Sequence, residues 1–139
     1  NILTSIQLDE MLTDVYESIP IDKKLKDLVE LIKKSEKNIF AVTDGKDRFV
    51  GIIELNDVKQ KIFQVDQFDK ISVKAMMKRP PAILQQGQDM HSVMEQFDIT
   101  QSCYLPVLSK ERKFVGFISK TKLFNKYREV LSQQVDLYE

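Results

Sequence analysis

The chain has 139 residues, of which 42% are hydrophobic and 30% charged, and this balance predicts one ordinary globular domain with its own core. No apolar run approaches the ~20 residues that a membrane-spanning helix needs, and the single cysteine excludes an internal disulfide. The formal net charge is zero, and we expect no nucleic-acid partner. Because the first residue is Asn rather than Met, we interpret the chain as a fragment excised from a longer protein.

The chain opens with a lead-in, an extended segment and an amphipathic helix. Residues 1–14 are expected to pack on the core, and residues 15–21 to be extended because Pro20 biases the residue before it away from helix. A helical stripe follows, with apolar residues spaced for one face of a helix. These residues are Leu25, Leu28, Val29 and Ile32. Asp22 is placed to cap the start of this helix.

A hairpin and a closing helix complete the first half. Residues 39–43 and 49–53 are continuous apolar runs, which are typical of strands buried on both faces. The polar segment 44–48 between them contains a glycine and predicts the turn of the hairpin. Residues 56–64 are then expected to form the closing helix of this half.

The second half begins after a polar connector at residues 65–72. Residues 73–78 predict one helical turn, and the Pro80-Pro81 pair forces residues 82–84 into an extended segment. A second helical stripe follows, with Asp89 as its expected cap. Its apolar residues are Met90, Val93, Met94 and Phe97.

The chain ends with a second hairpin and a last helix. Residues 104–108 and 114–118 predict the two strands, and Pro106 indicates that the first of them is an edge strand or carries a bulge. Residues 120–131 predict the helix. The polar tail from residue 132 to 139 is expected to fray.

These elements are two copies of one unit. The stretch 49–54 recurs at 114–119, an offset of 65 residues. The same offset pairs Met11 with Met76, Leu25 with Met90, Leu28 with Val93, Val29 with Met94, Ile32 with Phe97 and Val42 with Val107. Each copy reads strand, helix, strand, strand, helix, and alone would leave one sheet face uncovered. We therefore predict an α+β domain in which the two βαββα repeats pack sheet to sheet around a pseudo-twofold axis.

Catalysis and metal binding have little support in the sequence. The one histidine, His91, has no cysteine or carboxylate at ligand spacing, so we interpret it as a surface residue. Cys103 lies beside a predicted strand and is expected to be buried and inert. We therefore expect no enzyme activity, no catalytic residue and no metal site.

The two corners that follow the repeated glycines are the candidate ligand site. A glycine allows close backbone approach, and the N-terminus of the next helix suits phosphate. A hydroxyl three residues after the glycine could bond phosphate, and a carboxylate six residues after it could accept a ribose diol. The alternative is an ordinary helix start, because the same spacing makes a capping box. The candidate residues are Gly51, Ile53, Glu54 and Asp57 in the first corner, and Gly116, Ile118, Ser119 and Lys122 in the second.

The duplication, the Tyr104-Leu105-Pro106-Val107 stretch and the paired Val-Gly corners resemble a tandem CBS-domain pair, also called a Bateman module. The resemblance places repeat 1 at 11–64 and repeat 2 at 73–131. It also implies a Gly-h-h-Ser/Thr-x-x-Asp corner, with h apolar, and a cleft between the repeats that can bind adenine nucleotides. No cofactor is required, but AMP, ADP, ATP or adenosine is an expected ligand.

Neither corner matches the family pattern completely, so we expect weak nucleotide binding or none. In the first corner Asp57 matches the ribose-binding acid, but Glu54 replaces the hydroxyl. Glu54 puts a negative charge where phosphate would sit, and like charges a few ångströms apart cost on the order of 1–4 kcal/mol. In the second corner Ser119 matches the hydroxyl, but Lys122 replaces the acid. We expect adenosine-type ligands to favour the Asp57 side, and free phosphate or phosphate tails the side of Ser119 and Lys122.

A narrower resemblance concerns residues 68–74, the Pro80-Pro81-Ala82 triplet and residues 116–124 with Tyr127-Arg128. These are similar to the cytoplasmic tail of bacterial voltage-gated chloride channel (CLC) family proteins. The resemblance implies a regulatory domain on the cytoplasmic side of the membrane, joined to a transmembrane channel portion of the same protein. The alternatives are a ligand-sensing CBS pair of a soluble nucleotide-metabolism enzyme, and a structural interaction module without a ligand.

Two surface features bear on partners. The CBS resemblance implies a homodimer, and the helix stripes offer more apolar surface than one small sheet core would need, through Phe97, Leu123, Phe124 and Tyr127. Between Lys110 and Arg128 there are seven basic residues and one acid. This stretch is either an ordinary solvated face or a surface for phosphates or anionic lipid heads.

Overall fold

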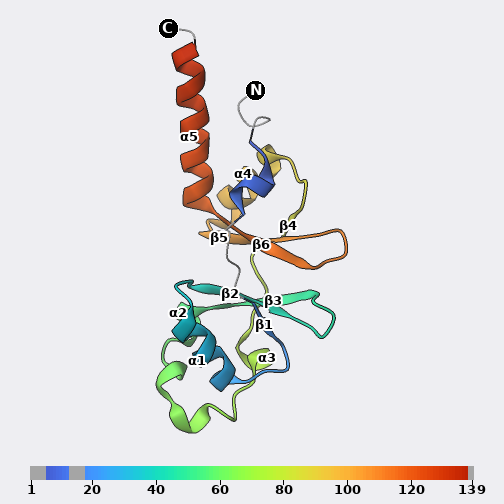
Figure 1. The fold of residues 1–139 in the computed structure, drawn as a ribbon, viewed down its shortest axis with the longest axis vertical. Helices are drawn as coiled ribbons and strands as arrows, with labels where there is room; N and C mark the ends of the chain where they lie inside the picture. The colour runs from blue at the N-terminus through green and yellow to red at the C-terminus, as the bar shows by residue number, and fades with distance from the viewer. Residues whose placement is uncertain (1–5, 13–17, 138–139) are drawn as a thin grey trace. The chain divides into compact units, whose positions relative to one another are not determined.

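The computed structural model describes residues 6–12 and 18–137, with side chains up to residue 134 (Figure 1). These residues form two compact units. Unit 1 holds residues 6–12, 81–110 and 115–137, and unit 2 holds residues 18–80 and 111–114. In each unit the helices lie on one side of that unit's own three-stranded sheet (Figure 1). The α+β class and the two βαββα repeats are thus confirmed.

Unit 2 is built from the first hairpin. Its sheet has the order β1-β2-β3, with β1 parallel and β3 antiparallel to the central strand. The bounds are Ser18–Pro20 for β1, Ile39–Thr43 for β2 and Phe49–Glu54 for β3. Its helices are α1 (Leu25–Lys34), α2 (Leu55–Val58) and α3 (Val73–Met76). Every residue of β2 is buried, as its continuous apolar run predicts.

The start of α1 is set by contacts distant in sequence. The predicted stripe is confirmed, since Leu25 and Leu28 are fully buried. The predicted cap is wrong. Helix α1 begins at Leu25, so its N-cap is Lys24 and not Asp22. The backbone N–H of Leu25 donates instead to the carbonyl of Ile71 at 2.8 Å, and that of Lys26 to Phe68 at 3.0 Å. The connector between the repeats therefore satisfies the first orphan N–H groups of α1.

The predicted closing helix 56–64 is also wrong in length. Helix α2 ends at Val58, and the chain continues as two short 3-10 turns, η3 (Lys61–Phe63) and η4 (Val65–Gln67). The reason is tertiary, because the chain must turn back to bring the carbonyls of Phe68 and Ile71 onto the start of α1. The turn leaves Phe63 80% exposed.

Unit 1 is built from the second hairpin and has the sheet order β4-β5-β6. The strands are β4 (Leu84–Gln85), β5 (Tyr104–Leu108) and β6 (Phe114–Ser119). Its other elements are η2 (Leu8–Met11), α4 (Met90–Thr100) and α5 (Lys120–Leu137). The predicted cap of α4 is confirmed, since the Asp89 carboxylate accepts the backbone N–H of Ser92 at 3.0 Å.

Pro106 lies in the central strand of this sheet, so the prediction of an edge strand is wrong. The sheet tolerates it because β4 is only two residues long and pairs with Val107 and Leu108. The N–H that Pro106 lacks falls outside that paired stretch, so no bond between β4 and β5 is lost.

The described part of the lead-in, residues 6–12, packs on a core as predicted, while residues 1–5 and 13–17 lie outside the described residues. Ile6, Leu8 and Met11 are at most 4% exposed and join the cluster that contains Phe97 and Leu123. The sequence-equivalent segment, α3, joins the cluster of unit 2 instead. Each lead-in therefore packs with the strands and helices of the other repeat, so the compact units do not coincide with the sequence repeats.

One further expectation, about the end of the chain, is wrong. Residues 132–137 continue α5 rather than fray, while residues 138 and 139 lie outside the described residues. Straight-chain residues such as glutamine favour helix, and a Lys126–Glu129 pair at 3.8 Å supports this one. Among the described residues, no helix is both long and apolar enough to cross a membrane.

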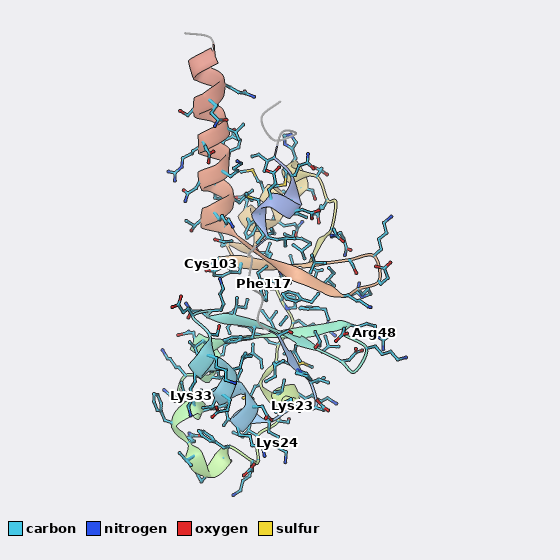
Figure 2. All side chains as sticks on the ribbon, in the orientation of Figure 1. Lys23, Lys24, Lys33, Arg48, Cys103 and Phe117 are labelled. Atoms are coloured by element: carbon cyan, nitrogen blue, oxygen red, sulfur yellow. The ribbon has the colours of Figure 1, made fainter. Side chains whose placement is uncertain are left out.

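Cys103 is exposed rather than buried (Figure 2). Its backbone, not its sulfur, serves the fold, because its carbonyl accepts the N–H of Lys120 at the start of α5 at 2.8 Å. His91 is exposed, as predicted.

Candidate functional site

The first corner, at the end of β3, is held against a segment that follows α3. The backbones of Ile52 and Lys78 exchange two hydrogen bonds, at 2.9 and 2.8 Å. A Cβ atom on Gly51 would lie 3.0 Å from the carbonyl oxygen of Lys78 and 3.2 Å from the sulfur of Met77. Gly51 is thus needed for close approach of two backbone segments.

This pairing places the ammonium of Lys78 over both carboxylates of the corner. The Lys78 Nζ lies 2.6 Å from Oδ2 of Asp57 and 3.3 Å from Oε2 of Glu54. All three side chains are about half exposed, at 44% for Lys78, 43% for Asp57 and 40% for Glu54. The hydrogen bond that the Lys78 ammonium donates to Asp57 raises the pKa of Lys78 above its ordinary value, against partial desolvation and with help from the charge of Glu54. The corner is therefore a charged trio with a net charge of about −1 rather than the bare −2 that its two acids suggest.

Lys78 was not among the residues predicted for the site. The signal that could have found it is the proline pair at positions 80 and 81, which favours extended backbone just before it. Extended backbone can pair with a free strand edge. Which strand it joins depends on tertiary structure, so sequence alone could not bring Lys78 to Asp57.

The second corner is arranged as a helix start. The Ser119 hydroxyl accepts the backbone N–H of Lys122 at 3.3 Å, so it caps the first turn of α5. Gly116 is buried in β6, and the side chain of Lys122 is exposed. The capping alternative is thus realised here, although a serine hydroxyl that accepts one bond still has its own hydrogen to donate.

The structure separates the predicted residues other than Gly116 into three groups. Gly51, Glu54 and Asp57 come together with Lys78, whereas Ser119 and Lys122 meet only through the cap. The third group is Ile53 and Ile118, which are 0% exposed. Their side chains belong to the cores, so only their backbone groups could face a ligand. No group of three metal-ligating side chains occurs among the residues that the structure describes.

Known proteins resemble this chain in sequence and in fold. A relative in Methanocaldococcus jannaschii, the uncharacterized protein MJ0188, is 24% identical over 83% of this chain and 42% of its own length. The structure of CbpB in complex with c-di-AMP has a TM-score of 0.75, 17% identity, and coverage of 96% of this chain and 91% of that one. For the cytosolic domain of the Mg²⁺ channel MgtE in complex with ATP, the TM-score is 0.72 at 17% identity, with coverage of 86% and 48%.

The chain spans less than half the length of MJ0188, so it corresponds to one part of that relative. The CBS domain family matches twice, over residues 7–64 and 73–129, which together are most of the chain. This double match agrees with the 65-residue offset and with the two βαββα repeats of the structure. The chain therefore belongs to the CBS domain family, as a tandem pair.

Proposed function

We propose that this CBS pair is a regulatory, non-catalytic part of a larger protein and that its first corner binds an adenine nucleotide. The main support for a nucleotide site is the charged trio formed by Glu54, Asp57 and Lys78. Asp57 offers a carboxylate for the ribose diol, and Lys78 offers a cation that can meet a phosphate. Proteins of the same fold have been solved with c-di-AMP and with ATP, which supports this class of ligand.

We further propose that the parent protein is a membrane transport protein with this pair on its cytoplasmic side. The similarity to the cytosolic domain of a Mg²⁺ channel supports a transport context. A chloride channel is the narrower version of this proposal, and it is supported by the Pro80-Pro81-Ala82 and Gly116-Phe117-Ile118-Ser119-Lys120 resemblance. The transport proteins among the similar structures carry Mg²⁺, so the chloride version rests on the sequence resemblance alone. A soluble enzyme regulated by the pair is the competing proposal, and sequencing the gene upstream of residue 1 separates the two.

Isothermal calorimetry with ATP, ADP, AMP and adenosine tests the proposed nucleotide site. Asp57→Ala should weaken binding of all four, because all carry the ribose diol. Lys122→Ala is the matched control from the second corner and should leave adenosine binding unchanged. Tight ATP binding that survives both substitutions would mean that the site lies elsewhere. No binding of any of the four to the wild type would leave the ligand-free interaction module as the correct function.

A further inference from the structure

We propose that Lys78 is the specificity-determining residue of the first corner, which moves from Asp57 to the phosphate of an incoming nucleotide. The corner then selects phosphorylated nucleosides over uncharged ones. This inference rests on the proposed function and adds to it the charge class of the ligand.

The backbone of Lys78 is fixed by hydrogen bonds to the sheet, whereas its side chain is about half exposed. Both of its backbone hydrogen bonds to Ile52 are made, and its carbonyl is packed against Gly51. The side chain, in contrast, is 44% exposed and held through its ammonium. Exposed ion pairs contribute little to stability and rearrange readily. A swing of the side chain therefore needs no change in the sheet.

The ion pair and the ribose compete for the same carboxylate. Oδ2 of Asp57 is occupied by the ammonium at 2.6 Å, whereas a ribose diol needs both carboxylate oxygens as acceptors. A ribose diol that binds both oxygens of Asp57 therefore competes with Lys78 for Oδ2 and weakens that ion pair. An uncharged nucleoside gives the displaced ammonium no new anion, whereas a nucleoside phosphate gives it a charge-assisted hydrogen bond.

Lys78 also offsets the repulsion that Glu54 would exert on a phosphate. An ammonium has three N–H donors, so it can bridge Glu54, now 3.3 Å away, and a phosphate oxygen at the same time. Placing a cation between two anions turns a repulsive contact into an attractive one. Glu54, which stands where the family pattern has a hydroxyl, is thereby made compatible with an anionic ligand.

The test compares AMP with adenosine by calorimetry on the wild type, Lys78→Met and Lys78→Arg. Lys78→Met keeps the apolar stem and removes the charge. The wild type should bind AMP about tenfold more tightly than adenosine, since a hydrogen bond to a charged group is worth that much. Lys78→Met should reverse the preference, with adenosine gaining from the released Asp57, and Lys78→Arg should keep it. Lys74→Met, an exposed lysine on α3 in the same unit, is the matched control and should match the wild type.

The outcomes separate the two proposals. If Lys78→Met binds both ligands with the wild-type ratio, the role of Lys78 is overturned and the nucleotide site stands. If the wild type binds neither ligand, both are overturned. Should Lys78→Met fail to fold, carbon-13 NMR of the wild-type lysine side chains replaces it. AMP should then shift the Lys78 Cε resonance and adenosine should shift it differently, and equal shifts from both ligands would overturn the proposal.

Discussion

At the scale of single residues, the first corner depends on close contact between Gly51 and the carbonyl of Lys78. A Cβ atom placed there would lie 3.0 Å from a backbone oxygen that is itself hydrogen-bonded to Ile52 and cannot easily retreat. Overpacking at such a contact typically costs about 1–3 kcal/mol. The glycine is thus structural first, and it positions Lys78 as a consequence.

Gly51→Val should therefore lower the free energy of unfolding by about 1–3 kcal/mol, as measured by urea denaturation. The buried Gly116 should respond in the same direction to the same change. Gly45→Ala is the control, because a Cβ atom on Gly45 meets nothing within 4 Å. A Gly51→Val protein with unchanged stability but lost nucleotide binding would show that the glycine serves the ligand alone.

A second prediction at the scale of single residues concerns the stability of the fold in acid. The carboxylate of Asp44 accepts the backbone N–H groups of Lys46 at 2.8 Å and of Arg48 at 3.0 Å, and it pairs with the Arg48 side chain. These hydrogen bonds, above all the one from the backbone N–H of Lys46, lower the pKa of Asp44 below its ordinary value of 3.8. A depressed pKa means that the ionised form stabilises the fold above pH 3.8 and that this stabilisation is lost as the pH falls through the lower value.

Asp44→Asn keeps the shape of the side chain and removes the charge. It should be less stable than the wild type at neutral pH, and the difference should vanish in acid below the depressed pKa. Chemical denaturation of both proteins across that range measures it. A stability difference that stays constant with pH would assign the effect to the loss of geometry rather than of charge.

At the scale of elements, the two helix caps show what local sequence can and cannot predict. Asp89 precedes α4 by one residue and caps it, as its position predicts. Asp22 looks equivalent in sequence, yet α1 begins at Leu25 because carbonyls of the connector between the repeats bind its first N–H groups. The cap of α4 comes from the residue next to the helix. The first N–H groups of α1, in contrast, bind carbonyls more than forty positions away in the sequence.

Asp89→Ala should consequently destabilise the fold by about 1 kcal/mol, the usual loss of an N-cap hydrogen bond. Asp22→Ala, at an exposed position that does not cap α1, should change stability by less than about 0.5 kcal/mol. Thermal melts of the two variants compare them directly. Equal losses would contradict the assignment of the caps.

The same contrast holds for the rest of the fold. The hairpins and the long helices were predictable because continuous apolar runs and helical stripes carry them locally. The short α2, the central position of Pro106 and the exposure of Cys103 were not, because each depends on which segment packs alongside. In the candidate site, Asp57 and Glu54 could be found from their spacing, but Lys78 enters only through the pairing of two distant backbone segments.

At the scale of the whole molecule, the exposed apolar side chains bear on assembly. Phe97 and Leu123, which were expected to offer surface to a partner, are fully buried in unit 1 and no longer support a dimer. Ile99 on α4 and Leu131 on α5 remain 66% and 39% exposed in the same unit. The homodimer of this chain remains a proposal from the family resemblance, and Ile99 is the exposed apolar side chain of unit 1 that can test it.

We expect sedimentation velocity at high micromolar concentration to show a dimer. Ile99→Glu, which places a charge on α4, should shift the protein to monomer without changing its melting temperature. Thr121→Glu, at another exposed position, is the control and should leave the dimer intact. A wild type that remains monomeric at the highest concentration would count against an intrinsic interface.

Binding of an adenine nucleotide at the first corner, rather than at the second, can be followed residue by residue. Amide NMR of the wild-type chain during a titration with AMP tests it most directly, because each backbone N–H reports its own surroundings. If the first corner is the binding site, the largest saturable shifts fall on residues 51–57 and on Lys78. Shifts concentrated on residues 116–122, or no saturable shift at all, would contradict it.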